Sequence, residues 1–234
     1  STPVSQSLGQ QFVIDNRGGA GGLIGSEAAA KSAPDGYTFL LSSGSAAAIV
    51  PLITPKMPYD PAKDLVPVAA GARLELFLVV RADAPYKTFA EFIEHMKRNP
   101  GRLSYGSPGN GTSPHIAGEM MKSQAGVFSV HIPYRGSAAV LQDLLGGQLD
   151  YTFDPGISFS HVRAGRLRLL AVASLKRIGL FPDAPTLDEL GLKGFDASAW
   201  FGLLAPAGTP PAVVSKVQQD VARILTTPET RERF

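Results

Sequence analysis

The sequence predicts an α/β protein built from two lobes, and three observations support this fold class. Short apolar runs alternate with helical patterns along most of the 234 residues, which is typical of βα units and a largely parallel sheet. Glycines mark the connections, as at Gly146-Gly147 and Gly165. The last amphipathic pattern, 211–225, has no strand after it, so we expect it to pack on the N-terminal sheet and make that lobe discontinuous.

Each element follows from its local pattern. Thr88 precedes a clear amphipathic run and predicts a helix N-cap, whereas Pro51 kinks the helix that begins near Ala46 unless it occupies the first turn. The predicted strands or extended segments are 11–15, 37–42, two segments within 66–81, 103–105, 129–134, 151–154, 169–174 and 197–205. The predicted helices are 22–32, one from Ala46, one from Thr88 to near Asn99, 113–124, 137–145, 158–164, 186–190 and 211–225.

The chain is expected to pass between lobes twice, near 76–81 and near 199–204, which makes a hinge with two crossings and a cleft between the lobes. We therefore assign residues 1–78 plus 201–234 to lobe 1 and 79–200 to lobe 2. Trp200, the only tryptophan, falls in the second crossing, where we expect a buried aromatic side chain.

Residues 105–115, called the glycine loop below, join a strand to a helix. Glycines let backbone approach a ligand closely, and the free amides at a helix start favour an anion. Gly106 and Gly111 have the spacing of a nucleotide P-loop, but Thr112 stands in place of its lysine, so a carboxylate fits better than a phosphate. The alternative is a plain turn in which Thr112 or Ser113 caps the helix. The candidate ligand-binding residues here are Ser107, Gly109, Asn110, Gly111, Thr112, Ser113 and His115.

Further candidates stand at other strand ends. Asp154 ends an apolar strand, where it either accepts a hydrogen bond from a ligand or caps the next helix. Gly136 lies in the turn after another strand. Ser42, Ser43 and Gly44 offer a second group of amides and hydroxyls, with an N-cap as the alternative.

Composition excludes several functions. The 22 basic and 20 acidic residues nearly balance and form no long runs, which argues against a nucleic-acid partner. No cysteine is present, the four histidines lack metal-ligand spacing, and no catalytic or cofactor motif occurs, so we expect no metal, no cofactor and no enzyme. No apolar run reaches the roughly 18 residues of a membrane span, so we expect a soluble protein. A small hydrolase stays open if His115 reaches a nearby serine; otherwise His115 orders its own loop through a backbone hydrogen bond.

With these motifs in order, the chain resembles the Bug family, the periplasmic solute-binding receptors of tripartite tricarboxylate transport systems. The similarity covers nearly the whole chain. The motifs that carry it are Asp15-Asn16-Arg17-Gly18-Gly19-Ala20-Gly21-Gly22, Asp35-Gly36-Tyr37-Thr38, Pro58-Tyr59-Asp60-Pro61, Lys63-Asp64, the glycine loop, Pro133-Tyr134-Arg135-Gly136, Asp143-Leu144-Leu145-Gly146-Gly147 and Ala205-Pro206-Ala207-Gly208-Thr209-Pro210.

The resemblance implies two α/β lobes that close over a small carboxylated metabolite, a periplasmic location and delivery to membrane transporter subunits. Family loops near the ligand match Ser42 to Gly44, the glycine loop with His115, and Asp154. The family begins with a strand and a glycine-rich loop ahead of the first helix. Here residues 1–10 are similar to the tail of that helix, so lobe 1 is expected to lack its N-terminal strand, and the chain stops short of the family's final helices. A non-binding module kept for protein contacts is a third hypothesis.

Overall fold

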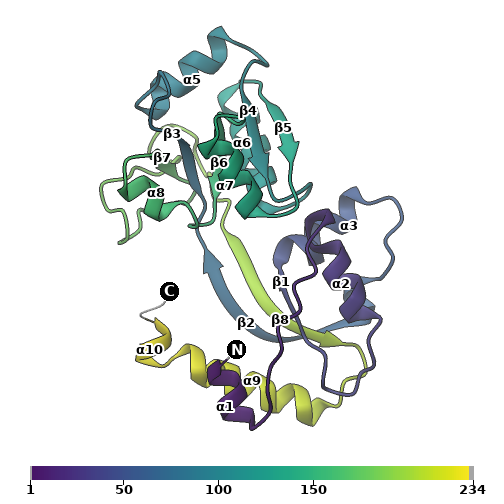
Figure 1. The fold of residues 1–234 in the computed structure, drawn as a ribbon. Coiled ribbons are helices and arrows are strands. Elements are labelled where there is room, and N and C mark those ends of the chain that lie inside the picture. Colours follow the sequence, from purple (N-terminus) through teal and green to yellow (C-terminus); the bar gives the residue numbers. More distant parts are fainter. Residues whose placement is uncertain (1, 232–234) are drawn as a thin grey trace. The chain divides into compact units, whose positions relative to one another are not determined.

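Two β-sheets organise the computed structural model, which describes residues 2–231 (Figure 1). The chain divides into two units. The first unit holds residues 1–18, 22–72 and 200–234, and the second holds 19–21 and 73–199. Apart from the short segment 19–21, the chain passes from the first unit to the second between Ala72 and Arg73 and returns between Ala199 and Trp200. Ser1 and residues 232–234, which the predicted lobe 1 includes, lie outside the described residues.

The first unit contains a three-stranded sheet with the order β1-β8-β2. Helix α9 packs on this sheet through Val217, which joins Val68 and Ala205 in one apolar cluster. Helix α1 lies beside α9 and is joined to it by the hydroxyl of Ser7, which donates to Asp220 Oδ1 at 2.9 Å (Figure 1). The elements of the first unit are α1 (Thr2–Leu8), η1 (Ala20–Gly22, shared with the second unit), α2 (Leu23–Ala30), β1 (Leu40–Ser43), η2 (Ser45–Ile49), α3 (Val50–Ile53), α4 (Pro61–Asp64), β2 (Leu65–Leu74), β8 (Ala199–Pro206), α9 (Pro211–Leu225) and α10 (Pro228–Arg231).

Two predictions for the first unit need correction. The strand predicted at 11–15 does not form, because this run pairs with no other strand in the described part of the chain, and Val13 is 82% exposed. The strand predicted at 37–42 begins only at Leu40. Pro51 does occupy a first turn, that of α3, where its missing N–H is harmless, so the segment from Ala46 divides into η2 and α3.

The second unit contains a five-stranded sheet with the order β5-β4-β6-β3-β7. Strands β4, β5, β6 and β7 run in one direction and only β3 runs antiparallel to its neighbours β6 and β7, so the expectation of a largely parallel sheet holds for this unit except at β3. The reason is that β3 continues from β2 rather than following a helix crossover, so no crossover fixes its direction. The elements are β3 (Phe77–Arg81), α5 (Phe89–Arg98), β4 (Ser104–Ser107), α6 (Ser113–Ala125), β5 (Val130–Pro133), α7 (Ser137–Leu145), β6 (Tyr151–Asp154), α8 (Phe159–Arg163) and β7 (Leu167–Val172).

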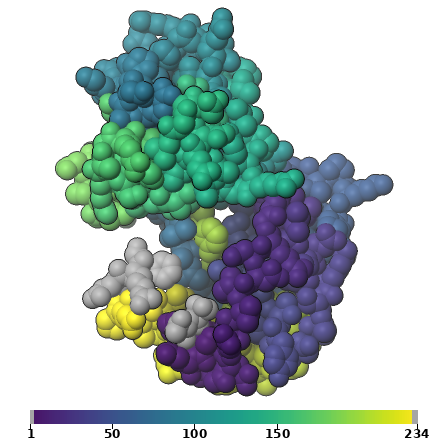
Figure 2. All heavy atoms as spheres, in the orientation of Figure 1, coloured from purple at the N-terminus to yellow at the C-terminus, as the bar shows by residue number. Residues whose placement is uncertain are grey.

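Helices cover both faces of this sheet. Because side chains alternate along a strand, Leu78 of β3 packs with α5 and α6 on one face while Val79 packs with α7 on the other. Aromatic side chains fill part of the interior, and the rings of Tyr105 and Tyr151 stack with centroids 5.2 Å apart. In the space-filling view the atoms of 73–199 pack into one continuous body (Figure 2). A rigid sheet with buried strands is what positions the loops at its edge.

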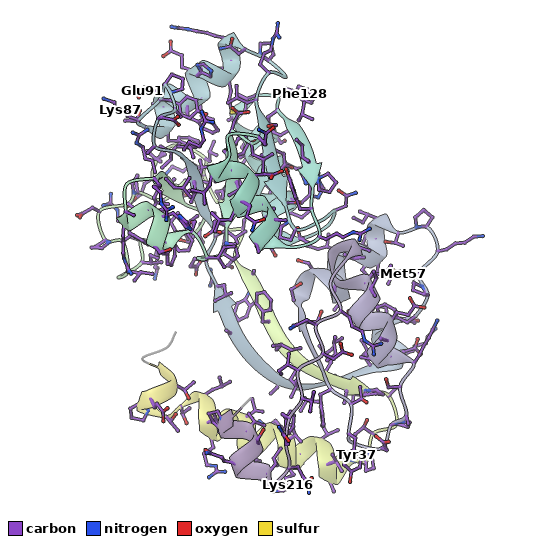
Figure 3. All side chains as sticks on the ribbon, viewed as in Figure 1. Tyr37, Met57, Lys87, Glu91, Phe128 and Lys216 are labelled. Atoms are coloured by element: carbon purple, nitrogen blue, oxygen red, sulfur yellow. The ribbon has the colours of Figure 1, made fainter. Side chains whose placement is uncertain are left out.

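Local signals explain where helices begin in this unit. Lys87 and Glu91 lie at the start of α5 (Figure 3). Thr88 accepts from Glu91 N–H, and the Glu91 carboxylate accepts from the amides of Lys87 and Thr88, which completes a capping box. The helix predicted at 186–190 is wrong: Thr186 pairs with Val172 in an isolated bridge, and only one turn follows it.

Candidate ligand-binding site

The candidate site lies at one edge of the five-stranded sheet. Parallel strands end on the same side, so the carboxyl ends of β4, β5 and β6 bring Ser107, Pro133 and Asp154 to a common edge. A crevice there is lined by Pro108 of the glycine loop, Ser137 at the start of α7, and Asp154. The fold thus brings together the glycine loop, the turn at Gly136 and the turn after Asp154, which are the three turns predicted as ligand contacts in the second unit.

Hydrogen bonds inside the glycine loop hold its shape. Gly109 (φ 141°) and Gly111 (φ 77°) adopt backbone conformations that other residues rarely take. The N–H of Gly109 donates to Ser107 Oγ at 3.2 Å, that of Gly111 to His115 Nδ1 at 3.1 Å, and that of Thr112 to Gly109 O at 3.3 Å. Three backbone N–H groups that the sequence predicted as donors to an anion therefore already donate to acceptors within the loop.

Other donors at this edge have no such partner. Asn110 is exposed and takes part in no hydrogen bond among the described residues. Gly136, with φ 135°, is the N-cap of α7 and supplies no side-chain cap. The first amides of a helix have no intrahelical acceptor, so those of α7 lack both an intrahelical and an N-cap side-chain partner. These groups, with the positive end of the α7 dipole, favour a carboxylate. Thr112 stands at the N-cap of α6 without capping it, since its hydroxyl donates to Gly109 O at 2.7 Å.

Asp154 is 3% exposed and uses one oxygen to hold the following turn. Its Oδ2 accepts from the N–H of Gly156 at 2.7 Å and from the N–H and hydroxyl of Ser158 at 3.0 and 2.8 Å. The capping alternative for this residue is thus present. Oδ1 accepts none of the hydrogen bonds in the described part of the chain, so it stays open to a ligand hydroxyl. Burial raises the pKa of the carboxyl group, although the bonds from Ser158 and Gly156 act against the shift.

Two histidines lie against the glycine loop, and sequence reasoning identified only one of them. His131 on β5 stands opposite Tyr105 in the parallel register of β4 and β5, and its ring lies 4.2 Å from that of His115. Burial lowers the pKa of both imidazoles, that of His131 to about 4. Nothing in the local sequence around His131 signals this role, because it depends on strand pairing.

The serine–histidine pair that forms is not the one considered from sequence. Ser107 Oγ lies 2.7 Å from His131 Nε2, while His115 Nδ1 receives the Gly111 N–H, which is the loop-ordering alternative. Ser107 is fully buried, and no hydrogen bond in the described part of the chain joins His131 to a carboxylate. A nucleophile needs access to substrate and an oriented base, so this pair lacks two requirements of a hydrolase.

The remaining predicted residues belong to the first unit. Ser42 and Ser43 end β1, and Gly44 begins the turn into η2 without a side-chain cap. The N-cap alternative for this turn therefore finds no side-chain hydrogen bond. Trp200 lies beside Gly44 and is 57% exposed, so the expectation of a buried crossing aromatic is wrong.

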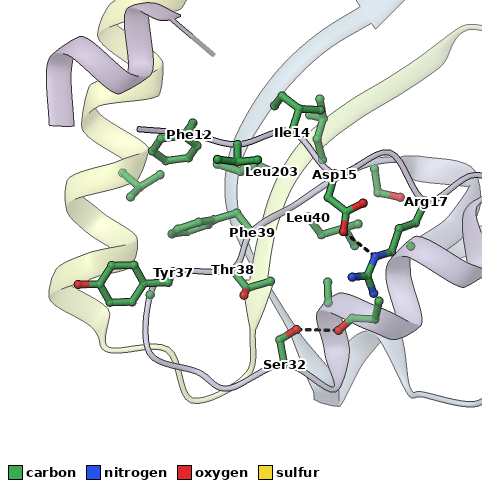
Figure 4. Close-up of a pocket in the computed structure, with 18 of the residues that line it drawn as sticks. Phe12, Ile14, Asp15, Arg17, Ser32, Tyr37, Thr38, Phe39, Leu40 and Leu203 are labelled. Carbon is green, nitrogen blue, oxygen red and sulfur yellow. Dashed lines mark hydrogen bonds and ion pairs between the residues drawn. The ribbon is translucent and has the colours of Figure 1, made fainter. Parts of the chain in front are cut away.

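The first unit also contains an apolar groove of about 1160 Å³ between residues 11–15, β1 and α9 (Figure 4). Phe12 and Phe39 face it with ring centroids 6.3 Å apart, next to Leu203. Its two basic lining residues are both paired, Arg17 with Asp15 and Lys216 with Asp220. Such a surface does not suit a small acid.

No helix within residues 2–231 is long and apolar enough to cross a membrane, and these residues contain no group of three or more histidine, aspartate or glutamate side chains that could hold a metal ion.

Comparison with known proteins places this geometry in a family. The model of the tripartite tricarboxylate transporter family receptor matches residues 1–234. BugT of Bordetella pertussis is 38% identical over 99% of this chain and 72% of its own. A Rhodopseudomonas palustris structure with adipate has a TM-score of 0.96 at 35% identity, and MatC from that organism with bound malate has 0.92 at 31%. Both alignments cover 99% of this chain; they cover 78% of the adipate-bound chain and 79% of MatC. The chain belongs to the tripartite tricarboxylate transporter receptor family, whose members include Bug proteins.

Proposed function

We propose that this chain is a periplasmic receptor that binds a small carboxylated metabolite between two lobes and delivers it, unchanged, to membrane subunits of a tripartite tricarboxylate transporter. The two lobes are 1–78 plus 201–234 and 79–200. One observation carries the proposal: the glycine loop, the start of α7 and Asp154 gather at one sheet edge. Family members solved with adipate and with malate support a carboxylate as ligand.

The chemistry divides between donors and one acceptor. The ligand carboxylate takes hydrogen bonds from the Asn110 region and from the amides that follow Gly136, where the helix dipole adds attraction. Asp154 Oδ1 accepts from a ligand hydroxyl. The turn at Ser42, Ser43 and Gly44 contacts the rest of the ligand from lobe 1. The hydroxyl groups of Ser107, Thr112 and Ser113 and the ring of His115 shape the loop around the carboxylate.

Binding without catalysis follows from the buried Ser107–His131 pair. Since the hydroxyl of Ser107 is inaccessible, it organises the loop and attacks nothing. The ligand recovered after incubation is therefore expected to be chemically unchanged.

Calorimetric titration with a panel of mono- and dicarboxylates, including adipate and malate, tests the proposal. Asn110→Asp places a negative charge beside the carboxylate and is expected to weaken binding about tenfold, equivalent to about 1.4 kcal/mol. Gln148→Glu makes the same change of charge at an exposed position elsewhere in the second unit and should leave the affinity within about twofold.

Three outcomes would overturn the proposal: no heat and no thermal shift with any acid, equal effects of the two variants, or conversion of the bound acid. The first supports a non-binding module, because a ligand of the native state must raise the apparent melting temperature. The last supports an enzyme, and mass spectrometry of the recovered ligand detects it.

A further inference from the structure

Two histidine rings hold the amides of Gly109 and Gly111 in the glycine loop. His115, in the first turn of α6, accepts the Gly111 N–H on Nδ1 at 3.1 Å. His131, on β5, contacts Ser107 Oγ through Nε2 at 2.7 Å, and Ser107 Oγ in turn accepts the Gly109 N–H. The rings lie 4.2 Å apart and are tilted by 30°. Gly111 is thus tied to one ring directly and Gly109 to the other through Ser107.

The hydrogen bonds assign the proton of neutral His115 and leave the tautomer of His131 open. His115 accepts the Gly111 N–H on Nδ1, so in its neutral form it carries its proton on Nε2. The hydroxyl of Ser107 lies within reach of two acceptors, Nε2 of His131 at 2.7 Å and the carbonyl of Gly109 at 3.1 Å, so it can donate to either.

Protonation affects the two rings differently. A charged His131 donates from Nε2 to Ser107 Oγ, and the hydroxyl hydrogen turns to Gly109 O, so every atom keeps a partner. A charged His115 has a hydrogen on Nδ1, where the Gly111 N–H also points, so donor faces donor and the bond is lost. Only His115 therefore couples its charge to the shape of the loop.

Burial keeps both rings neutral near pH 7, and the charges around them act in both directions. Glu119 of α6 is the acid that faces them, but Lys122 Nζ and the Tyr105 hydroxyl each donate to its Oε1 at 2.7 Å. Burial lowers the pKa of His115; Glu119 raises it and Lys122 lowers it. Burial also lowers the pKa of His131, as do a charge on His115 and Lys122. The ring of Tyr105 covers His131 from β4 with centroids 4.8 Å apart.

We propose that His115 and His131 are positioning residues that hold the glycine loop in its ligand-binding shape only while His115 is neutral, so that acid releases the ligand. This inference rests on the proposed function for its ligand and on the loop geometry for its mechanism. His131 sets the Ser107–Gly109 side of the loop, and His115 sets the Gly111 side.

Nitrogen-15 NMR of the ligand-free protein tests the mechanism without any ligand. The expected tautomer of neutral His115 is Nε2–H, and the Gly111 amide signal should shift with the titration of His115. The reverse tautomer at His115, or a Gly111 signal that ignores its titration, overturns the mechanism. Because this measurement involves no carboxylate, a failed receptor assignment leaves its result unaffected.

Affinity measured from about pH 7.5 to about pH 4.5 tests the functional consequence. His115→Asn keeps an acceptor oxygen near the position of Nδ1 but does not titrate, so its affinity should fall less steeply toward acid than that of wild type. His115→Ala removes the acceptor at every pH, so it should bind about tenfold more weakly than wild type at neutral pH and approach wild type in acid. Ligand protonation cancels in these comparisons, since all proteins meet the same ligand.

His95→Asn, on α5 outside the cluster, serves as control and should keep the wild-type pH profile. If His115→Asn also keeps that profile, the coupling between His115 and the loop does not exist. If no protein binds any acid, the proposed function fails while the NMR result still decides the mechanism.

Discussion

The second unit has a larger buried apolar core than the first, although both leave some large apolar side chains exposed. In the second unit Leu78, Phe92 and Tyr151 have no exposed surface. In the first unit Val13 is 82% exposed and Leu41 is 69% exposed. Both regions have the apolar patterns of strands, so the difference lies in pairing: a strand is stabilised by neighbours on its edges and faces as much as by its own residues.

The same contrast separates the two concave regions. The edge of the five-stranded sheet carries the polar side chains of Ser137, Thr152 and Asp154 among apolar ones, with a closely hydrogen-bonded loop beside them. The groove of the first unit is mostly apolar, and its basic residues are paired. The affinity of a site for a small acid depends on correctly positioned hydrogen-bond donors rather than on the volume of the cavity. The larger cavity is therefore the poorer candidate for the ligand.

Matched leucines in the two sheets should give the largest contrast. Leu78→Ala in β3 removes a fully buried side chain and should cost about 2 to 5 kcal/mol of unfolding free energy. Leu41→Ala in β1 should cost less than about 0.5 kcal/mol, because its side chain is mostly exposed. Denaturant titration followed by hydrogen exchange in each unit measures both. Equal losses would contradict the account of a well-packed second unit and a partly covered first.

Gly118 in α6 should give the next largest effect and sharpen the claim that packing decides in the second unit. Helix propensity alone predicts that Gly118→Ala stabilises by about 1 kcal/mol. A Cβ there would lie 2.3 Å from Tyr105 Cε2, so we expect a net loss of about 2 kcal/mol from overpacking. Gly179→Ala, with open space around it, should change stability by less than about 0.5 kcal/mol. A stabilised Gly118 variant in thermal unfolding would show that the ring moves freely.

These cases also show what sequence predicts. The span of α7 agrees with its local pattern, as does the start of α6 at Ser113, because amphipathic periodicity and glycine punctuation are local signals. The strand predicted at 11–15 does not form, and the role of His131 was not predicted. Both depend on which strands become neighbours, and local sequence does not specify this. The glycine loop was located from sequence, but not the internal partners of its amides, which come from Ser107 and His115 after folding. Its ligand contacts stay a prediction.

Thr88→Ala should have a smaller effect, confined to the start of α5. It removes the hydroxyl that accepts the Glu91 N–H and breaks the capping box, which should cost about 1 kcal/mol. Lys87→Ala keeps both backbone bonds to Glu91 and should cost less than about 0.5 kcal/mol. Chemical denaturation compares them. A loss in Thr88→Ala no larger than that in Lys87→Ala would mean that packing of Phe92 alone fixes this helix.

The smallest effect at neutral pH, and the most selective, concerns acid stability. All four histidines lie within 73–199, so histidine-linked acid sensitivity belongs to the second unit. The pKa of His131 falls from 6.5 to about 4 in the folded chain, so between these values the unfolded chain binds more protons and stability falls as pH decreases. His131→Gln keeps an acceptor near the position of Nε2 for Ser107 without titrating. We expect equal melting temperatures near pH 7.5, and below about pH 6 a shallower decline in the variant. His95→Asn should follow wild type throughout, and parallel curves for wild type and His131→Gln would show that the buried ring does not contribute to acid unfolding.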